Sequence, residues 1–284
     1  MRGSYKVVKF NISKWYKNYR IYLLVCLIGI VMFNRSHVFV GITEKYKYAV
    51  NFFAILPSVM GGYLGFSRFI SMFCVVLLFC DAPFMDDNQQ FVFTRVGKRR
   101  WVQGSEMYII IASFLYVLWL VVSTFLGALP NVGLSLQWGK IMENVCVTGE
   151  IKTLGFTQNI LLNWKVLLAF LYSFFSLWMT SVIIGLIMFL VNLFFSRVAG
   201  VIVGGLVVIF DGAILFLPNN LGKILFRFSP FSMIRLNDLN ITGQNKLYPG
   251  VIYAIVFYIL IILILMVIIM ANYKKVNIDI QERV

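Results

Sequence analysis

The sequence predicts an all-α polytopic membrane protein, and two properties of the whole chain lead to this prediction. Of the 284 residues, 61% are hydrophobic and 13% are charged, and the mean hydropathy is +0.87. Soluble domains carry about 25% charged residues. Apolar segments also recur along the chain at close to the roughly 20 residues that a helix needs to cross a bilayer. We therefore expect a bundle of six transmembrane helices.

Residues 1–20 are expected to form an N-terminal interfacial helix. Over residues 5–20, apolar and aromatic side chains alternate with lysines at helical spacing, which is the pattern of an amphipathic helix that lies on a membrane. Trp15, Tyr16 and Tyr19 are residue types that favour the headgroup layer. The apolar run that follows lacks a small-residue cleavage site, so we do not expect a cleavable signal peptide.

Six apolar segments are the predicted spans. The first is followed closely by Arg35 and His37, and the fourth is longer than a bilayer requires, so it should tilt or protrude. A long loop over residues 130–165 separates the third and fourth spans. Residues 218–248 are expected to form short interfacial or re-entrant helices before the last span, and residues 273–284 form a polar tail. The spans cover about 21–41, 60–80, 107–129, 166–195, 198–217 and 249–272.

The distribution of basic residues predicts the orientation. Lysine and arginine are denser in residues 1–20, in the loop 81–106, in the turn after the fourth span and in the tail than in the three opposite loops. Basic residues concentrate on the cytoplasmic side of membrane proteins, so both termini and the loop 81–106 are predicted to be cytoplasmic. The formal net charge of +14 suits a membrane surface. We expect no nucleic-acid partner, because the sequence offers no soluble basic face.

The loop 81–106 is the densest polar run between two long apolar segments, and we expect it to hold one short helix over residues 86–97. Asp86 and Asp87 are good N-cap residues, with glutamines three residues later as in a capping box. Gly97 is the expected end of this helix. The basic triplet that follows would meet the negative end of the helix dipole.

This predicted helix has two interpretations. Its apolar side could fit a groove on a partner protein, while its basic residues reach acidic groups on that partner. Alternatively, the segment is a solvated loop whose basic residues only follow the positive-inside rule. A further helix should restart near Trp101 and enter the membrane. The residues that a docking helix would use are Asp86, Asp87, Phe91, Val92, Arg95, Val96, Lys98 and Arg99.

Two charged residues lie inside predicted spans. Asp211 is well inside the fifth span, where a charge is costly, so it should face other helices or a water-filled cavity. It either lines a transport pathway or is a satisfied polar group in a helix seam. Arg68 has the same two interpretations, and its long side chain could also snorkel to the surface. Gly200 and Gly204 allow close helix packing, within one protomer or between two.

Catalytic and metal-binding patterns are absent from the sequence. His37 is the only histidine, the four cysteines form no CxxC pair, and no two intramembrane carboxylates could share acid and base roles. No segment matches the phosphate-binding loop GxxxxGK[ST]. We therefore expect no catalytic residue, metal or cofactor in this chain. If the protein uses ATP, another polypeptide binds it.

The chain resembles the membrane subunits, or permeases, of ABC-2-type ABC transporters, especially small members from Gram-positive bacteria. The run DAPFMDD from Asp81, followed by TRVGKRRW from Thr94, resembles the family's cytoplasmic loop between spans two and three. The order of an interfacial helix, six spans and two cytoplasmic ends is also similar. The motif FSPF from Phe228 resembles the family's extracellular re-entrant region. The long loop 130–165 departs from the simplest members, so the resemblance says nothing about its role.

The resemblance implies a division of labour in a bacterial cytoplasmic membrane. Two membrane subunits, alike or different, would dock on two copies of a separate ABC ATPase, which would bind ATP and Mg²⁺. The helix 86–97 would sit in a groove of the ATPase. A peptide, lipid or amphipathic drug would be exported, or extracted from the membrane, between the protomers along spans two and five.

Two other functions remain open at this point. The chain could be a membrane-embedded immunity or sensor protein that binds a peptide antibiotic without transport, and it would then need no ATPase-docking loop. It could also be a lipid-modifying membrane enzyme, for which polar residues at the interfaces would supply the catalytic group.

Overall fold

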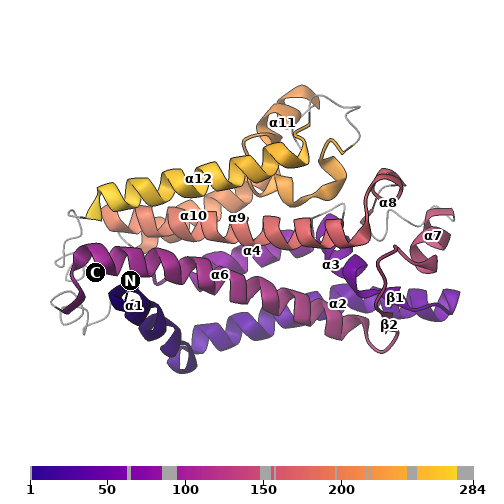
Figure 1. The fold of residues 1–284 in the computed structure, drawn as a ribbon, viewed down its shortest axis with the longest axis horizontal. Coiled ribbons are helices and arrows are strands. Elements are labelled where there is room, and N and C mark those ends of the chain that lie inside the picture. The colour runs from indigo at the N-terminus through magenta and orange to yellow at the C-terminus, as the bar shows by residue number, and fades with distance from the viewer. Residues whose placement is uncertain are drawn as a thin grey trace.

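The computed structural model describes residues 2–62, 65–84, 95–147, 155–156, 158–195, 197–214, 217, 219–241 and 248–273. This part of the chain is largely helical, with one pair of two-residue strands (Figure 1). The predicted helix 86–97 therefore lies mostly outside the described residues, and so does the tail from residue 274.

The chain is an all-α protein with four to five candidate membrane-spanning helices among the described residues. Four helices are long and apolar enough to cross a bilayer, and a bent pair, α3 and α4, makes a fifth if it is counted as one span. Helix α10 is apolar but shorter. Each predicted span overlaps a helix, yet six full-length spans are not established. The bounds are α2 Tyr19–Tyr46, α3 Phe52–Gly61, α4 Phe66–Leu78, α6 Lys98–Ala128, α9 Val166–Phe194, α10 Arg197–Ile214 and α12 Val251–Ala271.

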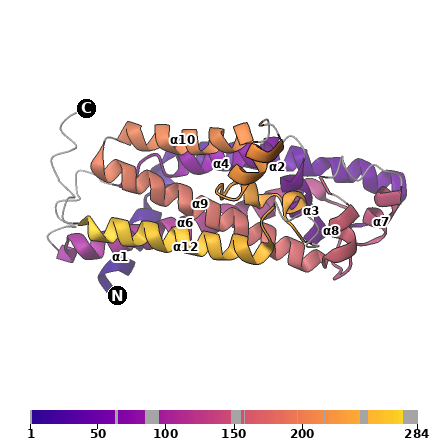
Figure 2. The same cartoon turned by 90° about the horizontal axis from the view of Figure 1, so that it is seen from above.

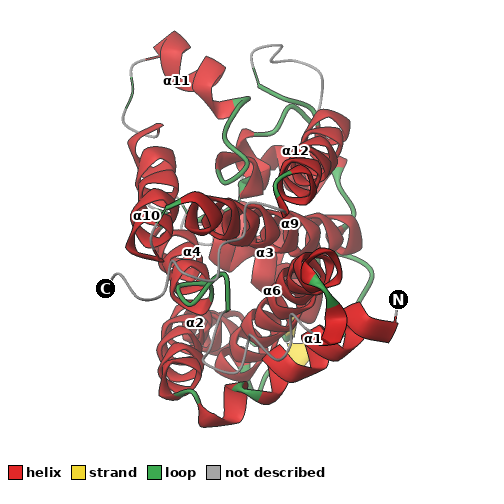
Figure 3. Ribbon diagram, turned by 90° about the vertical axis from the view of Figure 1, so that its left-hand side faces the viewer, coloured by secondary structure: helices red, strands yellow, loops and turns green. Residues whose placement is uncertain are grey.

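Helix α9 occupies the centre of the bundle, between α10 and α12 (Figure 2, Figure 3). It also packs on α3 and α6, while α2 packs against the other side of α6. The buried hydroxyls of Ser176, Thr180 and Ser181 each donate to a carbonyl three or four residues earlier in α9. Small side chains that satisfy their own hydroxyl groups let neighbouring helices approach closely, which suits a central helix.

The two ends of the bundle differ in which elements they carry (Figure 1). At one end lie α1 (Arg2–Ser13), the start of α2, the end of α4, the start of α6 and the end of α12. We call this the basic end. The strands β1 (Val50–Asn51) and β2 (Val132–Gly133) lie at the opposite end. The two strands pair in parallel, with Val50 opposite Val132.

The N-terminal segment is divided differently from the prediction of one helix over residues 5–20. Helix α1 ends at Ser13, a 3-10 turn η1 covers Trp15–Lys17, and α2 begins at Tyr19. The physical reason is local: the Asn18 side chain accepts a hydrogen bond from the backbone N–H of Arg20 and so caps α2. Helix α2 then continues through Arg35, whose guanidinium lies over the ring of Phe66.

The second predicted span is wrong as a single helix over residues 60–80. Helices α3 and α4 meet at an angle of 86°. Gly65, which precedes α4, has φ +61°, a left-handed conformation that favours glycine. A β-carbon on Gly61, the last residue of α3, would overlap the carbonyl oxygen of Gly155. The break therefore depends on a close approach between segments far apart in the sequence.

The long connection after α6 contains two short helices, α7 (Lys140–Val147) and α8 (Gln158–Asn163). The indole N–H of Trp138 donates to the carbonyl of Trp164 at 2.7 Å. The Trp138 ring also meets the edge of buried Phe156. These contacts tie the start of this connection to its end, beside the first residues of α9.

Between α10 and α12, the chain forms α11 (Asn219–Phe226) and two 3-10 turns, η3 (Ser232–Ile234) and η4 (Leu236–Asp238). All three residues of η3 are buried. Tyr172 of α9 donates to the carbonyl of Met233, and Tyr258 of α12 donates to that of Pro230. The segment 229–239 is therefore held between α9 and α12, with its carbonyls satisfied by tyrosine hydroxyls.

Candidate functional site

The predicted docking loop is described only at its two ends. Asp86, Asp87, Phe91 and Val92 lie outside the described residues. Arg95 and Val96 are helical, Gly97 interrupts the helix, and α6 begins directly at Lys98. Gly97 has φ +82° and ψ +146°, a backbone conformation that is open essentially to glycine alone.

The start of α6 differs from the sequence prediction of a restart near Trp101. Lys98, Arg99 and Arg100 form the first turn of α6 itself. They therefore lie at the positive end of its helix dipole, where cations are disfavoured. Trp101 is fully buried instead of standing at the helix entry. The dipole of α6 therefore does not stabilise the basic triplet, whose side chains are exposed or half-exposed at the basic end.

Helix α1 packs across the start of α6 on both sides of the Gly97 corner. A β-carbon on Gly3 would lie 3.2 Å from Val96 Cγ1, and one on Gly104 would lie 2.7 Å from Val7 Cβ. Val96, which the sequence placed on a partner-facing side, therefore contacts α1. The indole N–H of Trp15 donates to the hydroxyl of Tyr108 at 2.8 Å and extends the same contact.

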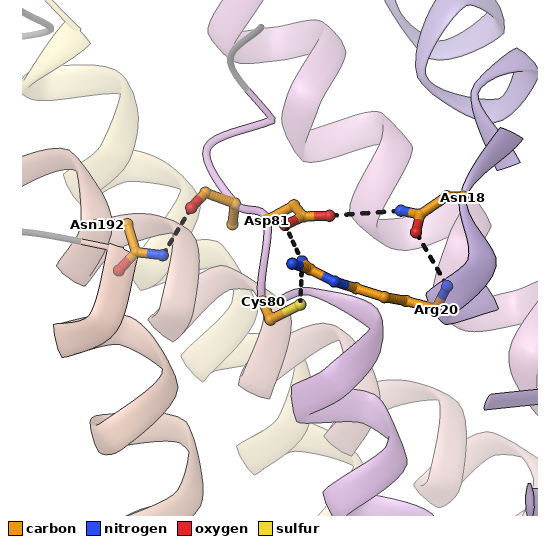
Figure 4. A network of polar contacts seen from close by, with 6 residues as sticks. Asn18, Arg20, Cys80, Asp81 and Asn192 are labelled. Atoms are coloured by element: carbon orange, nitrogen blue, oxygen red, sulfur yellow. Dashed lines mark hydrogen bonds and ion pairs between the residues drawn. The ribbon is translucent and has the colours of Figure 1, made fainter. Parts of the chain in front are cut away.

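The other end of the loop is held by a polar network around Asp81 (Figure 4). Its carboxylate pairs with the Arg20 guanidinium, which also donates to Cys80 Sγ at 3.4 Å. The Asn18 amide donates to the same carboxylate at 3.4 Å. On the other side, the Asn192 amide of α9 donates to the carbonyl of Ala82 at 2.7 Å. Residues 80–82 are therefore tied to both α2 and α9.

The contact between Arg20 and Asp81 was not predicted from the sequence, where Asp81 was noted only as the start of the loop 81–106. The sequence held a signal for this contact, because the two residues carry opposite charges. Both stand at the edges of predicted spans, on the same predicted side of the membrane. Their proximity follows only from the packing of α2 beside α4.

Arg68 lies in the first turn of α4 and is 1% exposed, so of its alternatives the snorkelling side chain does not hold, and a place in a helix seam or along a pathway stays open. Its guanidinium lies 5.4 Å from the ring centroid of Phe231, in the buried segment 229–239. A β-carbon on Gly65 would lie 2.7 Å from an Arg68 guanidinium nitrogen. The Arg68 side chain therefore folds back toward Gly65 at the break in the second span, and Phe231 of the α10–α12 connection lies over it.

The segment after η3 contacts the break directly. The Asn237 amide donates to the carbonyls of Gly61 and Gly155, at 3.2 and 2.7 Å. Nearby, Arg235 pairs with Asp238 at 2.8 Å. Burial, with the Asp238 carboxylate close by, raises the pKa of Tyr248 above its usual range.

The remaining predicted residues lie in α10. Asp211 is in this helix, but its side chain is outside the described part of the structure. Gly200 faces Asn192 of α9, because a β-carbon there would overlap Asn192 Oδ1. A β-carbon on Gly204 would lie 3.0 Å from Met188 of α9. Both glycines thus face α9 within this chain.

Glu106 is a buried carboxylate that the sequence assigned to the polar loop. It is 2% exposed inside α6, and its Oε1 atom has no hydrogen-bond partner among the described residues. Val102, Ile109 and Ser113, at helical spacing from Glu106, are also buried. This spacing was the signal in the sequence that Glu106 belongs to the inward face of α6.

In the described parts of the chain, no three histidine, cysteine or acidic residues are grouped as a metal site. Comparison with protein-family models, curated proteins and solved structures finds no match to this chain.

Proposed function

We propose that this chain is the membrane subunit of an ABC-2-type transporter, which exports a peptide, lipid or amphipathic drug with ATP hydrolysed by a separate subunit. The observation that supports this most is the anchoring of both ends of the loop 81–106. Residues 80–82 are tied to α2 and α9, whereas Val96 and Gly104 lie against α1. A partner bound between these anchors would push on two sets of helices at once.

The corner at Gly97 supports the same mechanism. Lys98 continues into α6 without an intervening loop, so a displacement of residues 95–97 moves a 31-residue helix directly. Helix α1 packs on that corner and would move with it. A solvated loop whose only task is to carry positive charge needs neither a direct continuation into a long helix nor a covering helix.

The rest of the assembly follows from this proposal. Two copies of an ABC ATPase, with ATP and Mg²⁺, would bind at the basic end, which would face the bacterial cytoplasm. A second membrane subunit, identical or homologous, would complete the pathway within the bilayer. Arg68 at the broken span and Asp211 in α10 would lie along that route or in the helix seams beside it.

The test is affinity purification from native membranes, with identification of the subunits that co-purify and assay of their ATP hydrolysis. We expect an ABC ATPase to co-purify. Phe91→Ala should weaken its binding by about 2 kcal/mol, roughly thirtyfold, because apolar anchors carry most of the energy of an interface. Lys98→Ala should cost less, and reversing the charge of Arg95 should alter the salt dependence.

The matched control is Leu134→Asp, which alters a strongly exposed apolar residue at the opposite end. It should leave ATPase binding unchanged, whereas Phe91→Asp should abolish it. Normal recruitment and stimulation of the ATPase by Phe91→Asp would show that the loop is not the docking site. Co-purification of a peptide without any ATPase would favour the immunity or sensor function instead.

A further inference from the structure

The outer surface of α1 and η1 combines lysines with tyrosines. Lys6 and Lys9 on α1 and Lys17 on η1 are exposed. Tyr5 and Tyr16 stand beside them, and Tyr16 is 66% exposed. The ammonium group of Lys17 lies 5.4 Å from the centroid of the Tyr16 ring. We call Tyr5, Lys6, Lys9, Tyr16 and Lys17 the elbow surface.

The apolar face of α1 is not available to lipid. Val7 and Val8 are buried, and Val7 contacts Gly104 of α6. An isolated amphipathic helix binds a bilayer by inserting its apolar face. Here Val7 and Val8 are used for packing within the protein, so the elbow surface, together with the exposed ring of Phe10, remains to meet another molecule.

The exposed residues of α2 indicate the depth of the elbow surface relative to a membrane. The exposed residues of α2 begin with Tyr19 and Tyr22 and continue with Leu23, Leu27 and Ile30. Tyrosine prefers the boundary between headgroups and acyl chains, whereas exposed leucine and isoleucine on a spanning helix face the acyl chains. The elbow surface is therefore at headgroup level, one turn before the apolar surface of α2 starts.

The orientation of α1 is consistent with a position at headgroup level. In the view along the bundle, α1 is seen from its side, while α2 and α9 are seen nearly end-on (Figure 3). Helix α1 thus runs across the bundle, and its exposed side extends along the plane that a membrane surface would occupy.

Among the described residues around the elbow surface, basic residues outnumber acidic ones. Among the described residues at the basic end, the carboxylates are Asp81, which pairs with Arg20, and Glu106, which is buried. Neither neutralises the elbow lysines. Arg99 and Arg100 add exposed positive charge at the start of α6, beside α1.

We propose that the elbow surface binds the headgroups of anionic phospholipids. The lysines would pair with lipid phosphates, and the tyrosines would lie at the edge of the acyl region, so that α1 is held on the membrane while it packs on α6. A lysine near an anionic membrane surface contributes roughly a fivefold preference for it. This inference does not rest on the proposed transport function.

The test measures lipid preference on the full chain. Purified protein is placed in liposomes of equal phosphatidylglycerol and phosphatidylcholine and re-extracted in mild detergent, and the retained lipids are quantified by mass spectrometry. The test variant combines Lys6→Gln, Lys9→Gln and Lys17→Gln. The matched control combines Lys45→Gln, Lys140→Gln and Lys165→Gln, three exposed lysines away from the elbow surface. Each protein is also assayed at high salt.

We expect the wild-type protein and the control to retain phosphatidylglycerol preferentially. The elbow variant should lose about tenfold or more of that preference, and high salt should reduce the preference of the wild type. An elbow variant with the wild-type preference, or a control that loses as much, would overturn the proposal. Loss of ATPase recruitment by the elbow variant with an unchanged lipid preference would instead assign this surface to a protein partner.

Discussion

Two arginines, one at each of the regions that hold this fold together, have opposite environments. The Arg20 side chain is 47% exposed and pairs with Asp81 at the basic end. Arg68 is almost fully buried and lies over Phe231 at the broken second span. An exposed ion pair is screened by water and salt and contributes about 0–1 kcal/mol. A buried guanidinium is fixed by the atoms around it, so its removal is felt through packing as well as charge.

The two regions hold their helices in different ways. At the basic end, the Arg20–Asp81 network is exposed and its contacts can break and re-form at little cost, whereas the packing of α1 on α6 and the buried Asn192–Ala82 hydrogen bond hold the same end together. The broken span is joined by the close approach of Gly61 to Gly155, by the half-buried amide of Asn237 that bonds to both, and by the buried Arg68 side chain. We expect mutations in the second region to unfold the protein more readily than mutations in the first.

The largest effect is expected from Arg68→Ala. The substitution leaves a cavity between α4 and the segment 229–239, and it should lower the stability by about 2–4 kcal/mol. Thermal unfolding in detergent, followed by tryptophan fluorescence, measures the change. The control is Arg68→Met, which restores most of the volume without the charge and should recover part of the loss. An unchanged melting temperature for Arg68→Ala would show that this side chain does not hold the break.

The next largest effect is expected from Gly61→Ala. The added methyl group would meet the carbonyl of Gly155, and relieving that overlap should cost about 1–3 kcal/mol. Gly41 in α2 is the matched control, because a β-carbon there meets nothing within 4 Å. Gly41→Ala should stabilise the helix by up to about 1 kcal/mol. Thermal unfolding in detergent measures the melting temperatures of both variants. Equal changes in melting temperature for Gly61→Ala and Gly41→Ala would contradict the close approach of Gly61 to Gly155.

Glu106→Gln should have a smaller effect of opposite sign. It keeps the shape of the buried side chain and leaves no carboxylate to be desolvated, and burying an unpaired carboxylate is costly. The melting temperature should rise or remain unchanged. Asp81→Asn at the exposed network is the comparison, and it should not raise the melting temperature. A marked loss of stability in Glu106→Gln would show that the charge of Glu106 is needed by a partner group.

The smallest effect is expected from the Arg20–Asp81 pair. A double-mutant cycle with Arg20→Gln and Asp81→Asn should give a coupling free energy of about 0.2–1 kcal/mol, which decreases as salt is added. The exchanged pair, Arg20→Asp with Asp81→Arg, should restore part of the coupling. A coupling as large as the cost of Arg68→Ala would remove the contrast between the two regions.

Much of the helical organisation was readable from hydropathy, because a long apolar run in a helix is a local property. Each predicted span overlaps a helix, and the corner glycine Gly97 was recognised from its position before a basic triplet. The restart was predicted near Trp101, and α6 begins three residues earlier, directly after Gly97. The Asn18 cap was also a local signal, yet the alternation of lysines with aromatic residues suggested a single helix through it.

The membrane class, the order of the helices and the concentration of basic residues near the N-terminus follow from composition and from neighbours along the chain, so they could be predicted from the sequence. The break in the second span, the burial of Arg68 and the contact between Arg20 and Asp81 arise from tertiary packing. Gly61 lies against the carbonyl of Gly155. Arg68 is covered by Phe231, which is more than 150 residues away in the sequence. No local pattern encodes such a contact, because its free energy comes from the packing of segments that only the fold brings together.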